Sequence, residues 1–252
     1  MGYVQLKKLY VNGCSWTDGD TLDLAGLTKM GEGRNYSYPK LVANELQFEL
    51  IDESRYGGSI NRIIRMCWEY LMKNDVHNTT FILEIPNGFR DEVYSNEIGR
   101  YFNITSGNLD NANDNTEDNV EWHLIKKDVI NSYFNFCNFE EFAKKEYINL
   151  MSLIYYIKQY TNNIYLLQPY DIINKENVYK GLITDRNIIK ISDSTFSCKE
   201  YNLIQDMCKF EKLSLGDELN NGIEDTHPGI SGHKKLSEII IKHLTKYEIN
   251  II

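Results

Sequence analysis

Short apolar runs alternate with amphipathic segments along most of the chain. Short apolar runs bounded by turn residues are typical of buried strands, whereas apolar residues that recur every three or four positions are typical of helices. The runs predict strands over residues 8–12, 48–52, 80–85, 163–168 and 188–191.

The predicted helices lie between these strands. One covers residues 38–46 with Pro39 in its first turn, and a long one covers residues 139–160. Another follows Ser59, which is a suitable N-cap, and the last begins near Ser231. The helix after Ser59 has its apolar residues at positions 60, 63, 64, 67, 68 and 71. Strands that alternate with helices indicate a parallel sheet covered on both faces. We therefore expect one α/β domain over residues 1–252, a doubly wound three-layer α/β/α sandwich with a mostly parallel five-stranded sheet.

Residues 100–122 interrupt this alternation with a polar segment in which many Asn residues are interleaved with Asp and Gly. The segment is too long for an ordinary connection, so we expect an irregular insertion there, either a functional loop or lid or a disordered stretch. It lacks the Gly and the terminal Glu of a calcium loop, and we expect no metal site in it.

Composition narrows the class of protein. The net charge of −9 over 252 residues argues against nucleic-acid and anionic-membrane partners. No apolar stretch approaches the roughly 18 residues that span a bilayer, and the N-terminus lacks the apolar core of a signal peptide. The odd, scattered cysteines are typical of reduced thiols, so we expect a cytoplasmic protein without metal or cofactor. These cysteines are Cys14, Cys67, Cys137, Cys198 and Cys208.

Candidate chemistry follows the ends of the predicted strands. Cys14-Ser15, Gly57-Gly58 and Pro86-Asn87-Gly88 come directly after the first, second and third strands. Asp225 and His227 precede the last helix. Because sites in open α/β sheets form at the carboxyl ends of strands, we expect all of these residues at one edge.

The pair Asp225 and His227 suggests acid–base chemistry. A carboxylate close before a histidine can hold the imidazole in one tautomer and stabilise its charged form, which is the supporting half of a Ser-His-Asp triad. The nucleophile must then come from elsewhere, and the candidate segment is residues 11–19 after the first strand.

Four separated segments resemble the four sequence blocks of the SGNH hydrolase superfamily, the GDSL-type esterases, and they occur in the family's order. These segments are Gly13-Cys14-Ser15-Trp16-Thr17, Gly57-Gly58-Ser59-Ile60-Asn61, Ile85-Pro86-Asn87-Gly88 and Asp225-Thr226-His227-Pro228 with Gly232-His233. Cys14 stands where the family usually has Asp, and the third block reads Pro86-Asn87-Gly88 rather than Gly-x-Asn.

The resemblance implies a role for each block. Ser15 is expected to be the nucleophile, His227 its general base and Asp225 the carboxylate that orients the imidazole. Glu224 remains an alternative to Asp225, since the commoner spacing in the family is three residues. The oxyanion hole is expected to combine the backbone N–H groups of Ser15 and Gly58 with the side chain of Asn87.

The expected function is that of an ester hydrolase acting through an acyl-serine on a small-molecule or carbohydrate ester, such as an O-acetylated sugar. The alternatives are an O-acyltransferase that uses the same triad, and a catalytically silent binding or structural module with the same fold.

Several neighbouring residues have two interpretations. Cys14 is either a second nucleophile or a packed thiol, and Trp16 either lines the site or packs in the core. Arg90 and Asp91 either face the pocket or form a surface ion pair. We expect His233 to be structural.

Overall fold

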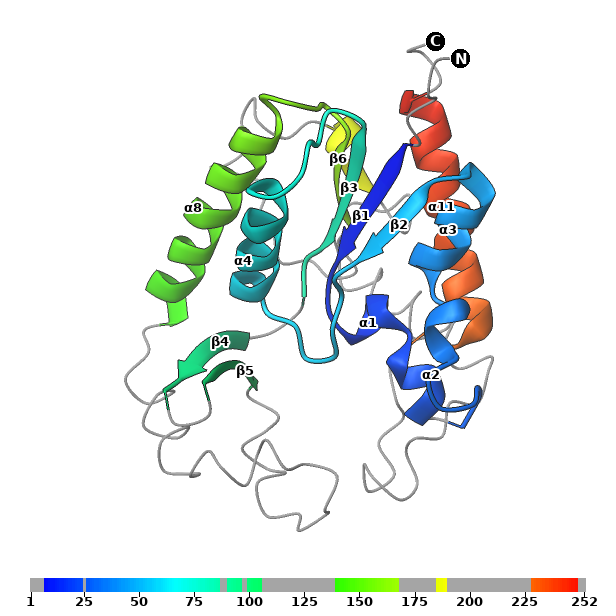
Figure 1. Cartoon of the computed structure of the whole chain (residues 1–252), viewed down its shortest axis with the longest axis horizontal. Coiled ribbons are helices and arrows are strands. Elements are labelled where there is room, and N and C mark those ends of the chain that lie inside the picture. The colour runs from blue at the N-terminus through cyan, green and yellow to red at the C-terminus, as the bar shows by residue number, and fades with distance from the viewer. Residues whose placement is uncertain are drawn as a thin grey trace.

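The computed structural model describes residues 7–24, 26–86, 90–96, 99–105, 139–167, 185–189 and 228–248. A five-stranded sheet in the order β2-β1-β3-β6-β7 forms its centre (Figure 1). The strands are β1 (Lys8–Asn12), β2 (Glu49–Asp52), β3 (Thr79–Glu84), β6 (Ile164–Leu167) and β7 (Ile188–Ile189). All of them lie within a residue or so of the ranges predicted from the apolar runs, except β7, which is shorter.

Every neighbouring pair of strands in this sheet is parallel. The chain begins in β1, steps outward to β2, and then crosses back to β3 on the other side of β1. This is the doubly wound, flavodoxin-like order, and the expected three-layer α/β class is confirmed. In such sheets the crevice at the carboxyl ends opens where the winding reverses, which here is between β1 and β3.

Helices cover both faces of the sheet (Figure 1). One face carries α3 (Tyr38–Leu46) and α11 (Ile230–Glu248), and the other carries α4 (Ile60–Leu71) and α8 (Phe139–Ile157). Pro39 lies in the first turn of α3, and the Ser59 side chain accepts the Arg62 N–H at 3.1 Å, as expected of an N-cap. Within the part of the chain that is described, no helix is both long and apolar enough to cross a membrane.

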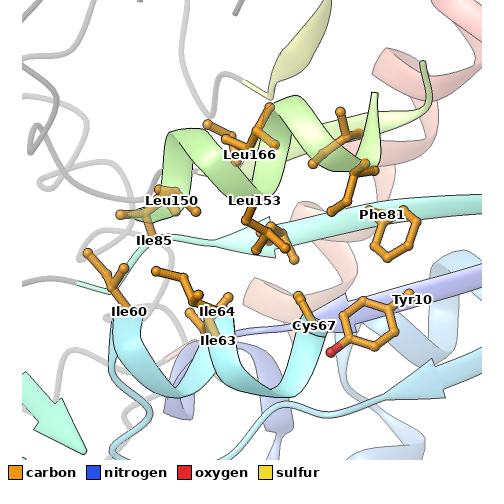
Figure 2. Packing of buried hydrophobic residues seen from close by; sticks show 14 of the residues in the cluster. Tyr10, Ile60, Ile63, Ile64, Cys67, Phe81, Ile85, Leu150, Leu153 and Leu166 are labelled. Atoms are coloured by element: carbon orange, nitrogen blue, oxygen red, sulfur yellow. The ribbon is translucent and has the colours of Figure 1, made fainter. Parts of the chain in front are cut away.

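A large part of the core lies between the sheet and the pair α4 and α8 (Figure 2). The apolar face predicted for α4 is confirmed, because Ile60, Ile63, Ile64 and Cys67 are buried there and Trp68 and Leu71 pack against them. All six residues of β3 are buried, which shows that helices exclude water from both faces of this strand.

An antiparallel hairpin of β4 (Arg90–Ser95) and β5 (Arg100–Thr105) stands beside the main sheet. Arg65 of α4 holds it with two bonds to the Glu92 carboxylate, at 2.7 and 2.8 Å, and stacks 4.3 Å from the centre of the Tyr101 ring. The segment predicted to be irregular thus begins as a strand over residues 100–105, and residues 106–122 lie outside the described part.

Short elements complete the described chain. They are α1 (Ser15–Asp18), α2 (Asp20–Leu24) and the 3-10 turns η1 (Gly33–Asn35) and η3 (Asp185–Asn187). Of these, α1 matters most for the site because it follows β1 directly.

Candidate active site

The predicted nucleophile Ser15 is the first residue of α1, at the carboxyl end of β1, the strand between β2 and β3. Cys14 has extended backbone angles and its carbonyl accepts the N–H groups of Thr17 and Asp18, at 2.9 and 3.2 Å. The helix is a single turn because Gly19 follows with φ of 75°, a left-handed conformation that glycine adopts without strain. We call residues 13–17 the nucleophile turn.

The glycine block lies against the nucleophile turn, as predicted. The Arg55 N–H donates to the Gly13 carbonyl at 3.2 Å. A Cβ on Gly58 would fall 2.7 Å from that same carbonyl oxygen, so only glycine allows the two turns to approach this closely. The Gly58 N–H itself donates to the Arg55 carbonyl at 2.9 Å.

A buried carboxylate that we did not predict as part of the site, Glu84, forms hydrogen bonds to the nucleophile turn. Glu84 ends β3 and is 0% exposed. Its carboxylate accepts the Cys14 N–H at 2.7 Å and the Thr17 hydroxyl at 2.5 Å. The signal in the sequence is one acidic residue in the otherwise uncharged run of residues 79–86, because a charge in a fully buried strand requires polar partners.

A second buried carboxyl group, that of Asp18, lies at the end of α1. Burial raises the pKa of the Asp18 carboxyl from 3.8 to about 7, and the charge of Asp20 adds to the effect. The Asp18 carboxyl accepts the Asp20 N–H at 2.9 Å, and Arg34 binds both carboxylate oxygens of Asp20, at 3.0 and 3.2 Å. Among the residues placed by the structure, no three His, Cys, Asp or Glu side chains come together in a way that could hold a metal ion.

The structure decides between the two interpretations of Cys14 and Trp16. Both are buried in the core cluster on the α3 and α11 face, so Trp16 is a packing residue. Burial and the nearby carboxylate of Glu84 raise the pKa of the Cys14 thiol well above its usual range. A protonated, buried thiol is inert, which favours Cys14 as a packed residue.

His233 is fully buried in α11, and its Nδ1 accepts the Tyr38 N–H at 3.2 Å. It thereby joins α11 to the start of α3, the structural role we expected.

Asp91 lies in the interior rather than on the surface. Its side chain is buried and its Oδ1 accepts the Asn61 amide N–H at 2.6 Å and the Glu92 N–H at 2.7 Å. Asn61 belongs to the glycine block, so Asp91 fixes the hairpin to the first turn of α4.

The remaining predicted residues lie outside the described part of the chain: Asn87, Glu224, Asp225 and His227. The described chain resumes at Pro228, and α11 begins at Ile230. In Figure 1 the orange, N-terminal end of α11 lies at the same edge of the sheet as α1 and α2.

No family model matches the sequence, and comparison with curated protein sequences finds no match either. Solved structures that resemble the chain include a psychrotrophic esterase from Pseudoalteromonas sp., with 12% identity over 96% of this chain and 99% of that one, at a TM-score of 0.43. A protein assigned to the lipolytic G-D-S-L family from Desulfitobacterium hafniense has 10% identity over 94% and 99% of the two chains, at a TM-score of 0.42.

A family two carbohydrate esterase from Clostridium thermocellum, solved in complex with cellohexaose, has 11% identity over 100% of this chain and 67% of that one, at a TM-score of 0.45. Esterases are thus among the proteins to which this chain is similar. At these identities and TM-scores, the similarity assigns no activity to this chain.

Proposed function

We propose that this protein is a serine ester hydrolase of the SGNH type. Ser15 Oγ attacks the ester carbonyl while His227 takes its proton, and Asp225 orients the imidazole. The tetrahedral intermediate expels the alcohol, which receives the proton from His227, and leaves an acyl-serine that water then hydrolyses.

The observation that carries this proposal is the position of Ser15. It is the first residue of a helix at the carboxyl end of β1, directly beside the switch point between β1 and β3. Gly58 of the glycine block packs against Gly13, two residues before Ser15. A serine in this place has its own N–H at the positive end of a helical turn, where negative charge on a substrate oxygen is stabilised.

The oxyanion hole in this proposal consists of the Ser15 N–H, the Gly58 N–H and the Asn87 side chain. The Gly58 N–H is bonded to the Arg55 carbonyl in the free protein. Its contribution therefore requires the glycine turn to share or release this bond when an ester carbonyl enters. In the best-studied case the loss of one such donor costs about 3 to 4 kcal/mol of transition-state stabilisation.

Labelling with a fluorophosphonate probe tests the nucleophile. We expect one probe per chain, on the tryptic peptide that contains Ser15, and no labelling of Ser15→Ala. The matched control is Ser54→Ala, which removes a hydroxyl from the loop after β2 that bonds to Asp52, and it should label as the wild type does. Absence of labelling in folded wild-type protein would contradict the enzymatic assignment and favour a silent module.

The substrate class we propose is a small acyl ester such as an O-acetylated carbohydrate, as the resemblance of the four blocks implies. Release of acetate from acetylated xylan or from p-nitrophenyl acetate tests it. Product analysis with a free sugar present separates hydrolysis from transfer, because a transferase would acetylate the sugar.

A further inference from the structure

Glu84 is the only charged residue of β3, and it is completely buried at the strand's carboxyl end. Burying a carboxylate is costly unless hydrogen bonds compensate for the lost water. In all of the hydrogen bonds that the structure shows for this carboxylate, the donor belongs to the nucleophile turn, which directly follows the neighbouring strand β1.

These bonds hold the nucleophile turn on both sides of Ser15. Glu84 Oε2 accepts the Cys14 backbone N–H at 2.7 Å and the Thr17 hydroxyl at 2.5 Å. The other oxygen, Oε1, accepts the Cys14 thiol at 3.0 Å. Because Cys14 precedes Ser15 and Thr17 follows it by two residues, the carboxylate fixes the backbone that carries the nucleophile.

Gly13 is what allows this contact. A Cβ at position 13 would lie 2.3 Å from Thr17 Oγ1 and 2.4 Å from Glu84 Oε2, and also 2.8 Å from the Cβ of Glu84. These are distances that real Cβ atoms do not show, so a side chain here would force the carboxylate off the turn. The glycine before the nucleophile thus serves the Glu84 contact as well as the turn itself.

The hydrogen bonds continue from the nucleophile turn to α3 and α11. Since the Thr17 hydroxyl donates to Glu84, it accepts from the Tyr38 hydroxyl at 3.0 Å. The Tyr38 N–H in turn donates to His233 Nδ1 at 3.2 Å. Glu84 is therefore the first member of a buried chain of contacts that ends in the helix following the Asp225–His227 block.

We propose that Glu84 is a positioning residue for Ser15. Through its bonds to Cys14 and Thr17 it fixes the position and orientation of the Ser15 hydroxyl. The inference rests on the proposed function, in which Ser15 reacts. In this role Glu84 bonds to Cys14 and Thr17, the residues on either side of Ser15 and Trp16. It acts by holding the turn, because displacing a reacting group by about 1 Å can cost on the order of 100-fold in rate.

The experiment compares the rate constant of fluorophosphonate labelling with its final extent, at a temperature well below the melting point. Glu84→Gln keeps the shape and one acceptor, but loses the charge that strengthens the bonds to Cys14 and Thr17. Thr17→Val removes the hydroxyl with little change of shape, and Thr17→Ser restores it. The matched control is Glu146→Gln, the same substitution at a buried glutamate of α8 outside the nucleophile turn.

We expect Glu84→Gln and Thr17→Val to lower the labelling rate constant by on the order of tenfold while the final extent stays at one probe per chain. Thr17→Ser should return to within about twofold of the wild type, and Glu146→Gln should label at the wild-type rate. With p-nitrophenyl acetate the loss should fall on kcat and leave KM unchanged, since nothing that holds the substrate is altered.

A purely structural role gives a different result. It would lower the melting temperature and the extent of labelling but leave the rate constant of the folded fraction unchanged, and that result overturns the positioning role. Should Glu84→Gln fail to fold, the Thr17→Val and Thr17→Ser pair decides, and equal rates for the two overturn it. Absence of labelling in the wild type overturns the proposed function itself, together with this inference.

Discussion

Replacing Asp18 by Asn should change how the stability of the protein depends on pH. Asp18 is completely buried at the end of α1, and burial raises the pKa of its carboxyl from 3.8 to about 7. Asn has nearly the same shape as Asp. It keeps an oxygen that can accept the Asp20 N–H, which in the wild type lies 2.9 Å from Asp18 Oδ1. It carries no ionisable proton, so only the titration is removed.

The sign follows from proton binding. Between about pH 4 and pH 7 the unfolded chain has lost the Asp18 proton while the folded chain keeps it, so folding is favoured at low pH. This contribution is complete below the unfolded pKa and is lost as the pH rises through the folded pKa. A difference of about 3 pH units corresponds to about 4 kcal/mol at 1.36 kcal/mol per unit.

Urea unfolding of wild type and Asp18→Asn at pH 4, 5, 6, 7 and 8, followed by circular dichroism, measures the difference. The free energy of unfolding of Asp18→Asn, relative to wild type, should increase with pH by up to about 4 kcal/mol and level off above pH 7. Asp75→Asn is the contrasting control, because the hydrogen bond from His77 lowers the pKa of the exposed Asp75 carboxyl and gives the opposite sign. Parallel stability curves for wild type and Asp18→Asn would refute the reasoning.

Two further substitutions test the contacts around the site. Gly58→Ala places a Cβ 2.7 Å from the Gly13 carbonyl oxygen. We expect the free energy of unfolding, measured with urea, to fall by about 1 to 3 kcal/mol, and Ser15 to be labelled more slowly. Unchanged values for both would contradict the close packing of the two turns. Arg65→Met leaves the 5% exposed Glu92 side chain without its cation. We therefore expect the free energy of unfolding to fall by about 1.5 to 3 kcal/mol, with faster proteolysis within residues 90–105. The double variant with Glu92→Gln should recover much of this stability. An additive double variant would show that this ion pair does not anchor the hairpin.

The sheet and its helices could be predicted because burial on both faces leaves a simple pattern. β3 and β6 are buried along their whole length, and such strands appear as continuous apolar runs. The hairpin of β4 and β5 could not be predicted in this way. It is joined to α4 by the contacts of Arg65 with Glu92 and Tyr101, and these residues are far apart in the sequence.

The positions of two candidate site residues could be predicted from short motifs. Ser15 and Gly58 could be placed at one edge of the sheet because each follows a strand in a recognisable block. Glu84 could not, because its importance depends on the register between β1 and β3, in which Asn12 lies beside Leu83. That register puts the carboxylate next to Gly13. The single acidic residue in the run of residues 79–86 indicates that Glu84 needs polar partners, but it does not say which residues these are.

The parallel order of the sheet has a practical consequence for fusing the protein to a partner or immobilising it on a surface. β1 starts and α11 ends at one edge of the sheet, while Ser15 lies at the other (Figure 1). A fusion partner, an affinity tag or a surface tether joined beyond either element therefore starts from the side away from Ser15. The protein could be immobilised beyond β1 or beyond α11 with the edge that carries Ser15 directed away from the attachment.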